Sequence, residues 1–424
     1  MPRWRGRSAD HRTATGLKRA IVPDVAIRLR LRDTLSGRRV QVAPVAKGGR
    51  KALTLYVCGV TPYESGHMGH AFTFCMFDVL VRYIESGGRR VRYVQNVTDI
   101  DDPLFERARR DEVDWRILAD RETKVHVRDM TVLGWRPPDI MPRVSDEIDQ
   151  IRSAALRLHA SGHAYHTDAL YFDTTRYRTY GKLSHRSRRS MLAKLRDEGL
   201  LGVVGPGAKR DALDFPLWRS SAPDEPAWPS AFGPGRPGWH IECSAMAMRH
   251  LGKQIDIHGG GRDLEFSHHE SERAQSEALT GKAPFARVWM HTGLVRYEGR
   301  KMSKSLGNLV KVSQALQRAP AAAIRLYLVE HRYGNDWDFS WSGLARATRV
   351  IGRAARVLAG DARGGGAKSL SPEGQALVKE FNAALGDDLD TPRAARVFRA
   401  AIRQREAVAL RAMASVLLGP ASLT

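Results

Sequence analysis

Hydrophobic residues follow two different patterns near the start of the chain. Residues 53–57 form a short apolar run, typical of a buried strand. From His67 onward the apolar positions have near-helical spacing: Phe72, Met76, Leu80 and Ile84. Residues 91–97 have the pattern of a second strand. A strand, a helix and a strand in this order predict a Rossmann-like parallel sheet, which binds ligands at the carboxyl ends of its strands.

The pattern then changes twice along the chain. Residues from about 99 to 232 look inserted, with helices around 107–133 and 146–160 and a strand at 170–172. Short strands beside glycines return at 255–257 and 288–291, and the chain beyond residue 338 is Ala/Leu/Arg-rich and helical, with a break at Gly364–Gly366. We therefore expect a basic disordered tail (1–26), an α/β catalytic domain (27–337) with an insertion at about 99–232, and a C-terminal helical bundle (338–424).

Composition narrows the class of protein without deciding its partner. The 424 residues are 42% hydrophobic, and no apolar run approaches the roughly 20 residues that span a bilayer. Three cysteines do not make a disulfide framework in so long a chain, so we expect a cytoplasmic protein whose thiols are free for metal binding or chemistry. The net charge of +22 attracts polyanions such as tRNA, but the excess of arginine runs along the whole chain and leaves the partner open. The Arg-rich start has two interpretations, a transit peptide or a disordered tail; we favour the tail.

Two separated motifs carry candidate nucleotide chemistry. His67-Met-Gly-His70 lies at a strand-to-helix turn, where helix N–H groups and imidazoles can contact a phosphate or ribose. Lys301-Met-Ser-Lys-Ser305 follows Glu298-Gly299 in a polar stretch, and Lys304 suits the β- and γ-phosphates of a triphosphate. Either motif alone also reads as an ordinary turn or a solvated basic loop. Together and in this order they predict adenylate formation from ATP and a carboxylate.

Two further groups of residues have ambiguous chemistry. His268 and Glu272 stand four residues apart, so both can face one ligand from the same side of a helix, but Cys58 and Cys243 are distant in sequence and equally typical of buried apolar positions. The cluster Asp99, Asp101 and Asp102 is consistent with Mg²⁺ binding and at least as well with capping of the helix that follows.

From Leu29 to Leu418 the chain resembles the cysteine-activating branch of class I aminoacyl-tRNA synthetases. The segments that carry the resemblance are 56–63 (YVCGVTPY), 95–102 (QNVTDIDD), 233–244 (GPGRPGWHIECS), 258–261 (HGGG) and the two motifs above. The resemblance implies a Rossmann-like class I catalytic domain with an inserted connective segment and a C-terminal helical domain. It also implies ATP, with Mg²⁺, as substrate and one Zn²⁺ per chain, held by Cys58, Cys243, His268 and, as in the synthetases, Glu272.

The resemblance also assigns roles to individual residues. Catalysis falls on His67, His70, Lys301 and Lys304. Contacts with the cysteinyl-adenylate fall on Cys58, Gly59, Val60, Thr61, Thr73, Asn96, Val97, Thr98, Trp239, Gly261, Arg262, Asp263 and Val295. Strand-end backbone groups would hold the amino acid, Trp239 would close the cysteine pocket, and Asp263 can bind ribose hydroxyls. A zinc that binds the substrate thiol as thiolate would separate cysteine from serine, whose hydroxyl is a poorer ligand.

Two families of this branch differ in the acceptor of the cysteinyl group. Thr61-Pro62-Tyr63, His70, Pro103–Arg107 and the short stretch after Asp387–Pro392 look like the ligases of mycothiol synthesis, which join cysteine to the amine of glucosaminyl-inositol. Glu272, Gln275–Glu277 and Ser305–Asn308 look synthetase-like, and Arg196–Gly202 does not match the Glu-Arg-Gly-Gly-Asp-Pro segment of the mycothiol ligases. We expect a monomeric ligase that uses L-cysteine, ATP and a small amino sugar, without an anticodon-binding domain. The alternatives are a shortened cysteinyl-tRNA synthetase that acts on tRNA, a ligase for another amine and a catalytically silent RNA-binding relative.

Overall fold

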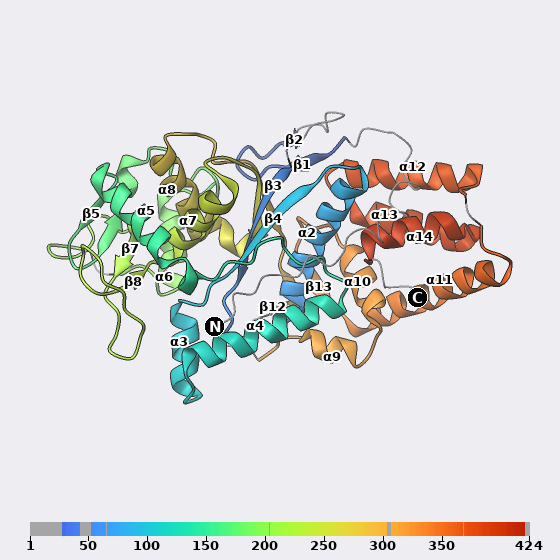
Figure 1. The fold of residues 1–424 in the computed structure, drawn as a ribbon, viewed down its shortest axis with the longest axis horizontal. Helices are drawn as coiled ribbons and strands as arrows, with labels where there is room; N and C mark the ends of the chain where they lie inside the picture. Colours follow the sequence, from blue (N-terminus) through green and yellow to red (C-terminus); the bar gives the residue numbers. More distant parts are fainter. Residues whose placement is uncertain are drawn as a thin grey trace.

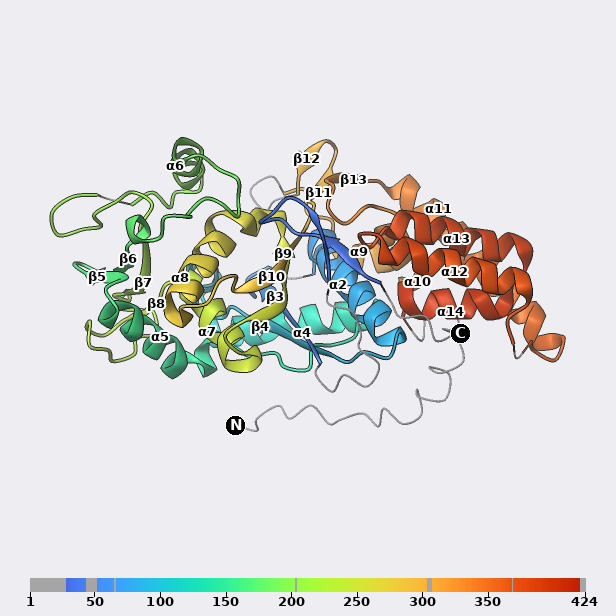
Figure 2. The same cartoon turned by 90° about the horizontal axis from the view of Figure 1, so that it is seen from above.

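A computed structural model describes residues 28–42, 52–64, 66–202, 204–302, 307–367 and 369–419. The predicted N-terminal tail lies outside these residues. Three regions follow one another along the long axis of the molecule: a small antiparallel sheet with its helices, a central parallel sheet, and a group of C-terminal helices (Figures 1 and 2). Among the described residues, no helix is both long and apolar enough to cross a membrane.

The central sheet has four parallel strands in the order β10-β9-β3-β4. They are β3 (Leu53–Val60), β4 (Val91–Val97), β9 (Ile255–Gly261) and β10 (Ala286–Thr292). From β3 the chain passes through α2 (Met68–Ser86) to β4 on one side, and only after the insertion does it reach β9 on the other side. The predicted Rossmann-like sheet is thus confirmed. The carboxyl ends of β3 and β9, where the strand order reverses, form the place where such sheets bind ligands.

Helix α2 has the buried face that the sequence pattern predicts, and it also carries a buried charge. Phe72, Met76 and Leu80 are fully buried against the sheet and the C-terminal helices. Asp78 on the same helix pairs at 2.6 Å with Arg325 of α10 (Ala321–Val329), and neither side chain is exposed. Arg325 also donates to the backbone carbonyls of residues 133 and 417. One guanidinium therefore ties α2 to the end of the last described helix.

The insertion combines helices with a four-stranded antiparallel sheet in the order β5-β6-β7-β8. The helical region predicted around 107–133 consists of the end of α3 and the whole of α4, because residues 111–114 break the helix and Asp114 caps the second one. The sheet extends to Arg236–Pro237, just before α7. The elements between β4 and β9 are α3 (Asp102–Arg110), α4 (Trp115–Val132), η1 (Val144–Asp146), α5 (Ile148–Ala160), β5 (Ala164–His166), β6 (Leu170–Phe172), η2 (Thr174–Arg176), α6 (Arg188–Asp197), β7 (Phe215–Arg219), β8 (Arg236–Pro237) and α7 (Trp239–Leu251).

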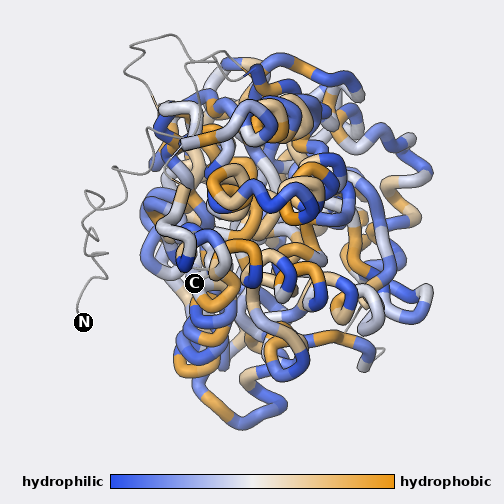
Figure 3. The backbone as a smooth tube through the Cα atoms, turned by 90° about the vertical axis from the view of Figure 1, so that its right-hand side faces the viewer, coloured by the Kyte–Doolittle hydropathy of each residue, from blue (hydrophilic) through white to orange (hydrophobic). Residues whose placement is uncertain are grey.

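The C-terminal part is helical, as predicted, and the chain breaks between α11 and α12 at the three glycines. Hydrophilic and hydrophobic stretches mix along the helical tube in Figure 3. Helices α11 and α13 each bury one apolar face in the core, whereas α14 is apolar and buried over most of its length. Its helices are α11 (Trp341–Arg363), α12 (Pro372–Gly386), α13 (Thr391–Gln404) and α14 (Ala407–Leu417).

The remaining elements border the central sheet, and an N-terminal hairpin among them has no counterpart in the sequence-based expectation. They are β1 (Arg30–Arg32), β2 (Arg39–Gln41), η3 (Arg262–Leu264), η4 (Glu265–His269), α8 (Glu270–Thr280), β11 (Val295–Tyr297), β12 (Arg300–Lys301), α9 (Val312–Leu316) and β13 (Trp337–Phe339).

Candidate metal centre and active site

Four buried side chains meet at the carboxyl end of β3. Cys58 comes from β3, Cys243 from α7, His268 from the turn before α8, and Glu272 from α8. One ligand atom of each lies within 4.8 Å of the others. His268 Nε2 is 3.0 Å from Glu272 Oε1, and the Cys58 thiol donates to the same oxygen at 3.3 Å. The chain thus gathers two sulfurs, an imidazole nitrogen and a carboxylate from parts of the sequence more than 200 residues apart.

The charges in this cluster favour cation binding. Burial alone would raise the pKa of the Cys243 thiol, but its hydrogen bond with Cys58 and the charge of His268 lower that pKa to about 6. Burial also opposes the charge on Glu272, yet His258 and His268 hold its pKa well below the usual range. Burial opposes the charge on His268, but Glu272 and Cys243 raise its pKa to about 10. One imidazolium therefore faces a thiolate and a carboxylate in a buried site, and the remaining negative charge is costly unless a cation balances it.

Three further histidines, His258, His269 and His291, lie beside this four-residue cluster. The sequence reasoning missed them. His258 Nε2 lies 2.9 Å from Glu272 Oε2, and His269 Nε2 lies 3.3 Å from the sulfur of Cys58. His269 Nδ1 is in turn 2.7 Å from His291 Nε2. Cys58, His258 and His269 also satisfy the geometry of a three-ligand metal group. The signal was present in the His258 glycine motif, the His268-His269 pair and the strand that contains His291, but no spacing rule connects them.

The ends of β3 and β4 form one wall of the site. The Asn96 side-chain oxygen accepts from Gly59 N at 2.9 Å and lies 3.6 Å from the sulfur of Cys243. A Cβ atom on Gly59 would lie 1.6 Å from the carbonyl oxygen of Asn96, so only glycine fits. Asn96 donates to Thr98 Oγ1 at 2.9 Å, Thr98 N donates to Val60 O at 3.0 Å, and Val60 pairs with Val97. The strand-end residues predicted to hold a substrate therefore lie together beside the sulfurs.

Trp239 closes the other side of this cluster. It is the first residue of α7, and its indole ring stacks on the His268 ring with centroids 4.2 Å apart. Cys243 follows one helical turn later on the same helix. The ring therefore covers His268, one of the four clustered side chains.

The first nucleotide motif is built around the N-terminus of α2. His67 caps this helix: its Nδ1 accepts from the N–H groups of Gly69 and His70 at 3.1 and 3.4 Å, and its ring stacks on that of His70 at 3.8 Å. Burial lowers the pKa of His70 to about 4, and burial followed by the charges of His70, His126 and Lys301 lowers the pKa of His67. Both imidazoles are thus neutral near pH 7 and can serve as hydrogen-bond groups beside the helix terminus.

The other residues predicted to contact the adenylate lie on α2, at the end of β9, in the turn after it and on β11. Thr73 of α2 is hydrogen-bonded to Thr292 at 2.7 Å, which joins the helix to this sheet edge. Gly261 ends β9, and a Cβ there would lie 2.5 Å from the Asp263 carboxylate. The Arg262 guanidinium turns away to Asp336 at 2.9 Å, and Val295 is buried in β11.

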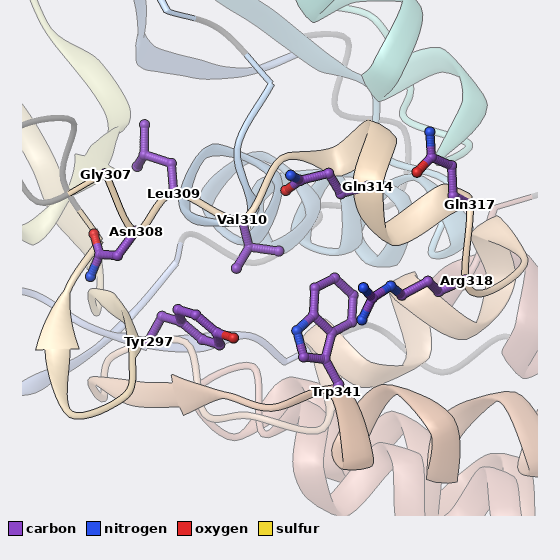
Figure 4. Close-up of a pocket in the computed structure, with 9 residues that line it drawn as sticks. All are labelled: Tyr297, Gly307, Asn308, Leu309, Val310, Gln314, Gln317, Arg318 and Trp341. Atoms are coloured by element: carbon purple, nitrogen blue, oxygen red, sulfur yellow. The ribbon is translucent and has the colours of Figure 1, made fainter.

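The second motif is described only in part. Lys301 is exposed on β12, whereas Lys304 lies outside the described residues. Downstream of the motif, a pocket of about 290 Å³ opens between the 307–310 segment, α9 and the start of α11 (Figure 4). Arg318 lies over the Trp341 ring in this pocket, 4.1 Å from its centroid. None of the predicted site residues that the structure describes lines it, so it is separate from the cluster of Cys58, Cys243, His268 and Glu272.

Comparison with known proteins identifies the family and the fold. Residues 44–349 match the family model of the tRNA synthetases class I (C) catalytic domain, and the chain belongs to this family. The L-cysteine:1D-myo-inositol 2-amino-2-deoxy-alpha-D-glucopyranoside ligase of Frankia alni is 47% identical over 341 residues, 80% of each chain. The cysteine–tRNA ligase of Aquifex aeolicus is 39% identical over 86% of this chain and 74% of its own length. The fold is similar to Mycobacterium tuberculosis methionyl-tRNA synthetase bound by methionyl-adenylate, with a TM-score of 0.63, 15% identity, and coverage of 87% of this chain and 92% of that one.

Proposed function

We propose that this protein activates L-cysteine with ATP and joins it to the amine of 1D-myo-inositol 2-amino-2-deoxy-alpha-D-glucopyranoside. The observation that supports cysteine as the substrate is the buried set of two thiols, an imidazole and a carboxylate at the ligand-binding edge of the sheet. The acceptor is supported by several ligases of this name that are 41–47% identical to the chain. In the first step the carboxylate of cysteine attacks the α-phosphorus of ATP and releases pyrophosphate. In the second the acceptor amine attacks the carbonyl carbon and releases AMP.

The donor set fits zinc. Cys58, Cys243 and His268 match its preference for sulfur and nitrogen, and Glu272 fills a fourth place or yields it to a ligand. When bound, zinc supplies a Lewis acid that holds the thiol of the substrate as thiolate and discriminates against the hydroxyl of serine. The protein contributes the Trp239 wall beside it.

The remaining side chains act on the nucleotide and the amino acid. Neutral His67 and His70 lie where the α-phosphate meets the helix terminus, and their N–H groups stabilise the charge that develops as pyrophosphate leaves. Lys301 and Lys304 neutralise the outer phosphates together with the Mg²⁺ that accompanies ATP. Asp263 binds ribose hydroxyls, and Gly59, Val60 and Asn96 hold the amino acid through the strand ends.

A second candidate, cysteine–tRNA ligase, has support of its own. Glu272 is held at 3.0 Å from His268, in the place where the synthetases of this branch carry a zinc-ligating glutamate, and tRNA ligases 39–42% identical to the chain cover most of it. Both candidates share the first half-reaction and differ only in the acceptor.

Cysteine-dependent exchange of pyrophosphate into ATP tests the shared half-reaction. We expect exchange with cysteine and at least about 100-fold less with serine at equal concentration, because a single well-placed thiol contact discriminates on this scale. Exchange that is equal with serine, or absent with cysteine in the zinc-loaded protein, would contradict the proposed activity.

A further inference from the structure

The three aspartates after β4 have different partners. Asp99 accepts from Ser145 N at 2.9 Å and from Ser145 Oγ at 2.6 Å, and it pairs with an arginine. Asp102 pairs with both Arg219 and Arg236. Asp101 instead caps α3 through the N–H of Asp102 at 3.0 Å and accepts from Thr61 Oγ1 at 3.2 Å. Within the described part of the chain, no lysine, arginine or histidine forms an ion pair with Asp101. The charge of Arg236 acts on this carboxyl but only partly offsets burial and Asp102, which raise the pKa of Asp101 to about 6, and Arg236 itself pairs with Asp102 and Glu225.

Asp101 lies beside the proposed cysteine pocket. Thr61, its hydrogen-bond donor, comes directly after β3, three residues beyond Cys58. The ends of β3 and β4 are joined at this edge by Val60 and Thr98. In cysteine only Cβ and Cα separate the sulfur from the α-amine. A cysteine whose thiol binds at the Cys58 cluster therefore keeps its amine near the ends of β3 and β4, the strands that Thr61 and Asp101 follow.

Glu242 supplies a second, independent observation. It precedes Cys243 on α7 and is fully buried, yet neither of its carboxyl oxygens has a hydrogen-bond partner in the described structure. Cys243, the next residue on α7, lies 3.6 Å from the Asn96 side chain near the end of β4, so Glu242 is held close to the strand that leads to Asp101. Buried polar groups are normally hydrogen-bonded. Two carboxyls that lack an ion-pair partner among the described residues favour a ligand that is positively charged and rich in N–H donors.

We propose that Asp101, held by Thr61 and backed by Glu242, binds a primary ammonium group of a reactant. The inference rests on the proposed function, in which two reactants carry such a group: cysteine, through its α-amine, and the amino sugar. A carboxylate that receives an ammonium forms charge-assisted hydrogen bonds, which are about twice as strong as neutral ones. Asp99 and Asp102 cannot take this role because Ser145 and the arginines occupy them.

Asp101→Asn tests the proposal, because asparagine retains the capping of α3 but removes the charge. Glu106→Gln is the matched control: it removes an exposed carboxylate from the same helix. In exchange assays without acceptor, the KM for cysteine rises at least tenfold if the site binds the α-amine. 3-Mercaptopropionate, which lacks that amine, then inhibits the wild type and Asp101→Asn equally. If the site binds the amino sugar, exchange is unchanged and the KM for the sugar rises at least tenfold in the transfer assay.

Values of both KM within twofold of wild type, as expected for Glu106→Gln, would overturn the proposal. Should Asp101→Asn fail to fold, Thr61→Val reports on the same site, because it removes the hydroxyl that orients Asp101 and leaves the cap intact. An unchanged KM for both amines in Thr61→Val would then refute the role of Asp101. Failure of the proposed function has a different signature, namely a wild-type protein without cysteine-dependent exchange.

Discussion

Asp78 provides a direct test of how α2, beside the central sheet, is held to the C-terminal helices. The Asp78 carboxylate accepts from Arg325 Nη2 at 2.6 Å, from Arg82 Nε at 2.9 Å and from Arg136 N at 2.7 Å. Asparagine at this position offers one acceptor oxygen and turns N–H donors toward a guanidinium that is itself a donor. Arg325, which is fully buried, then keeps the carbonyls of residues 133 and 417 as its only partners among the described residues.

We expect Asp78→Asn to lower the free energy of unfolding by about 3–5 kcal/mol, the usual cost of leaving one member of a buried ion pair without its partner. Glu85→Gln on the same helix is the control. Its carboxylate lies 3.1 Å from Arg136, but it is 28% exposed, so its loss should cost less than about 1 kcal/mol. Urea denaturation of both variants, followed by circular dichroism, measures the difference.

The pH dependence of the free energy of unfolding provides a second test of the role of Asp78. Burial alone would raise the pKa of Asp78, but Arg325 and Arg82 lower it below the normal value. A carboxyl with a lowered pKa stabilises the folded state above its unfolded pKa of about 4, and this contribution is lost as the pH falls through the folded pKa. The gap between wild type and Asp78→Asn should therefore be constant at neutral pH and narrow below about pH 4. A destabilisation under about 1 kcal/mol at pH 7, or a gap that widens in acid, would refute the reasoning.

Three further outcomes follow from the site. The purified protein should contain about one zinc, and Cys243→Ser or His268→Ala should remove it, whereas Glu272→Ala should weaken zinc binding less. Stoichiometric zinc in Cys243→Ser, measured by metal analysis, would contradict the assignment. Lys304→Ala should lower the maximal rate of cysteine-dependent exchange more than tenfold, or about 1.4 kcal/mol, because the charge acts on the departing pyrophosphate; a rate equal to wild type would make the loop a bystander. With a net charge of +22, binding to RNA should weaken steeply with salt and be independent of sequence; salt-resistant binding of one tRNA in a filter assay would count against this.

The fold was largely predictable because its strongest signals are local. The apolar run of β3, the helical spacing in α2 and the pattern of β4 each span fewer than 20 residues, and their order determines a parallel sheet. Arg325 shows the limit of such reasoning. It interrupts an otherwise apolar helix, and nothing nearby in sequence indicates that Asp78, almost 250 residues away, makes its burial possible.

The candidate site was predictable only where a resemblance supplied the connections. Spacing joins His268 to Glu272, but no local pattern joins either of them to Cys58 or Cys243. His258, His269 and His291 were missed for the same reason: their contacts cross from one strand end or turn to another. The aspartates after β4 were treated as one cluster. Of the two interpretations, helix capping is confirmed for Asp101, whereas Asp99 and Asp102 have partners of their own.

The identity of the acceptor tests the account most directly. The zinc-loaded protein is given ATP and radiolabelled cysteine with glucosaminyl-inositol, with tRNA bearing the cysteine anticodon, or with a serine tRNA as control. We predict a cysteinyl amide of the amino sugar, formed with stoichiometric AMP, and no charging of either tRNA. Efficient cysteinylation of the cysteine tRNA alone, with no product from the amino sugar, would contradict the account and identify the protein as a tRNA ligase.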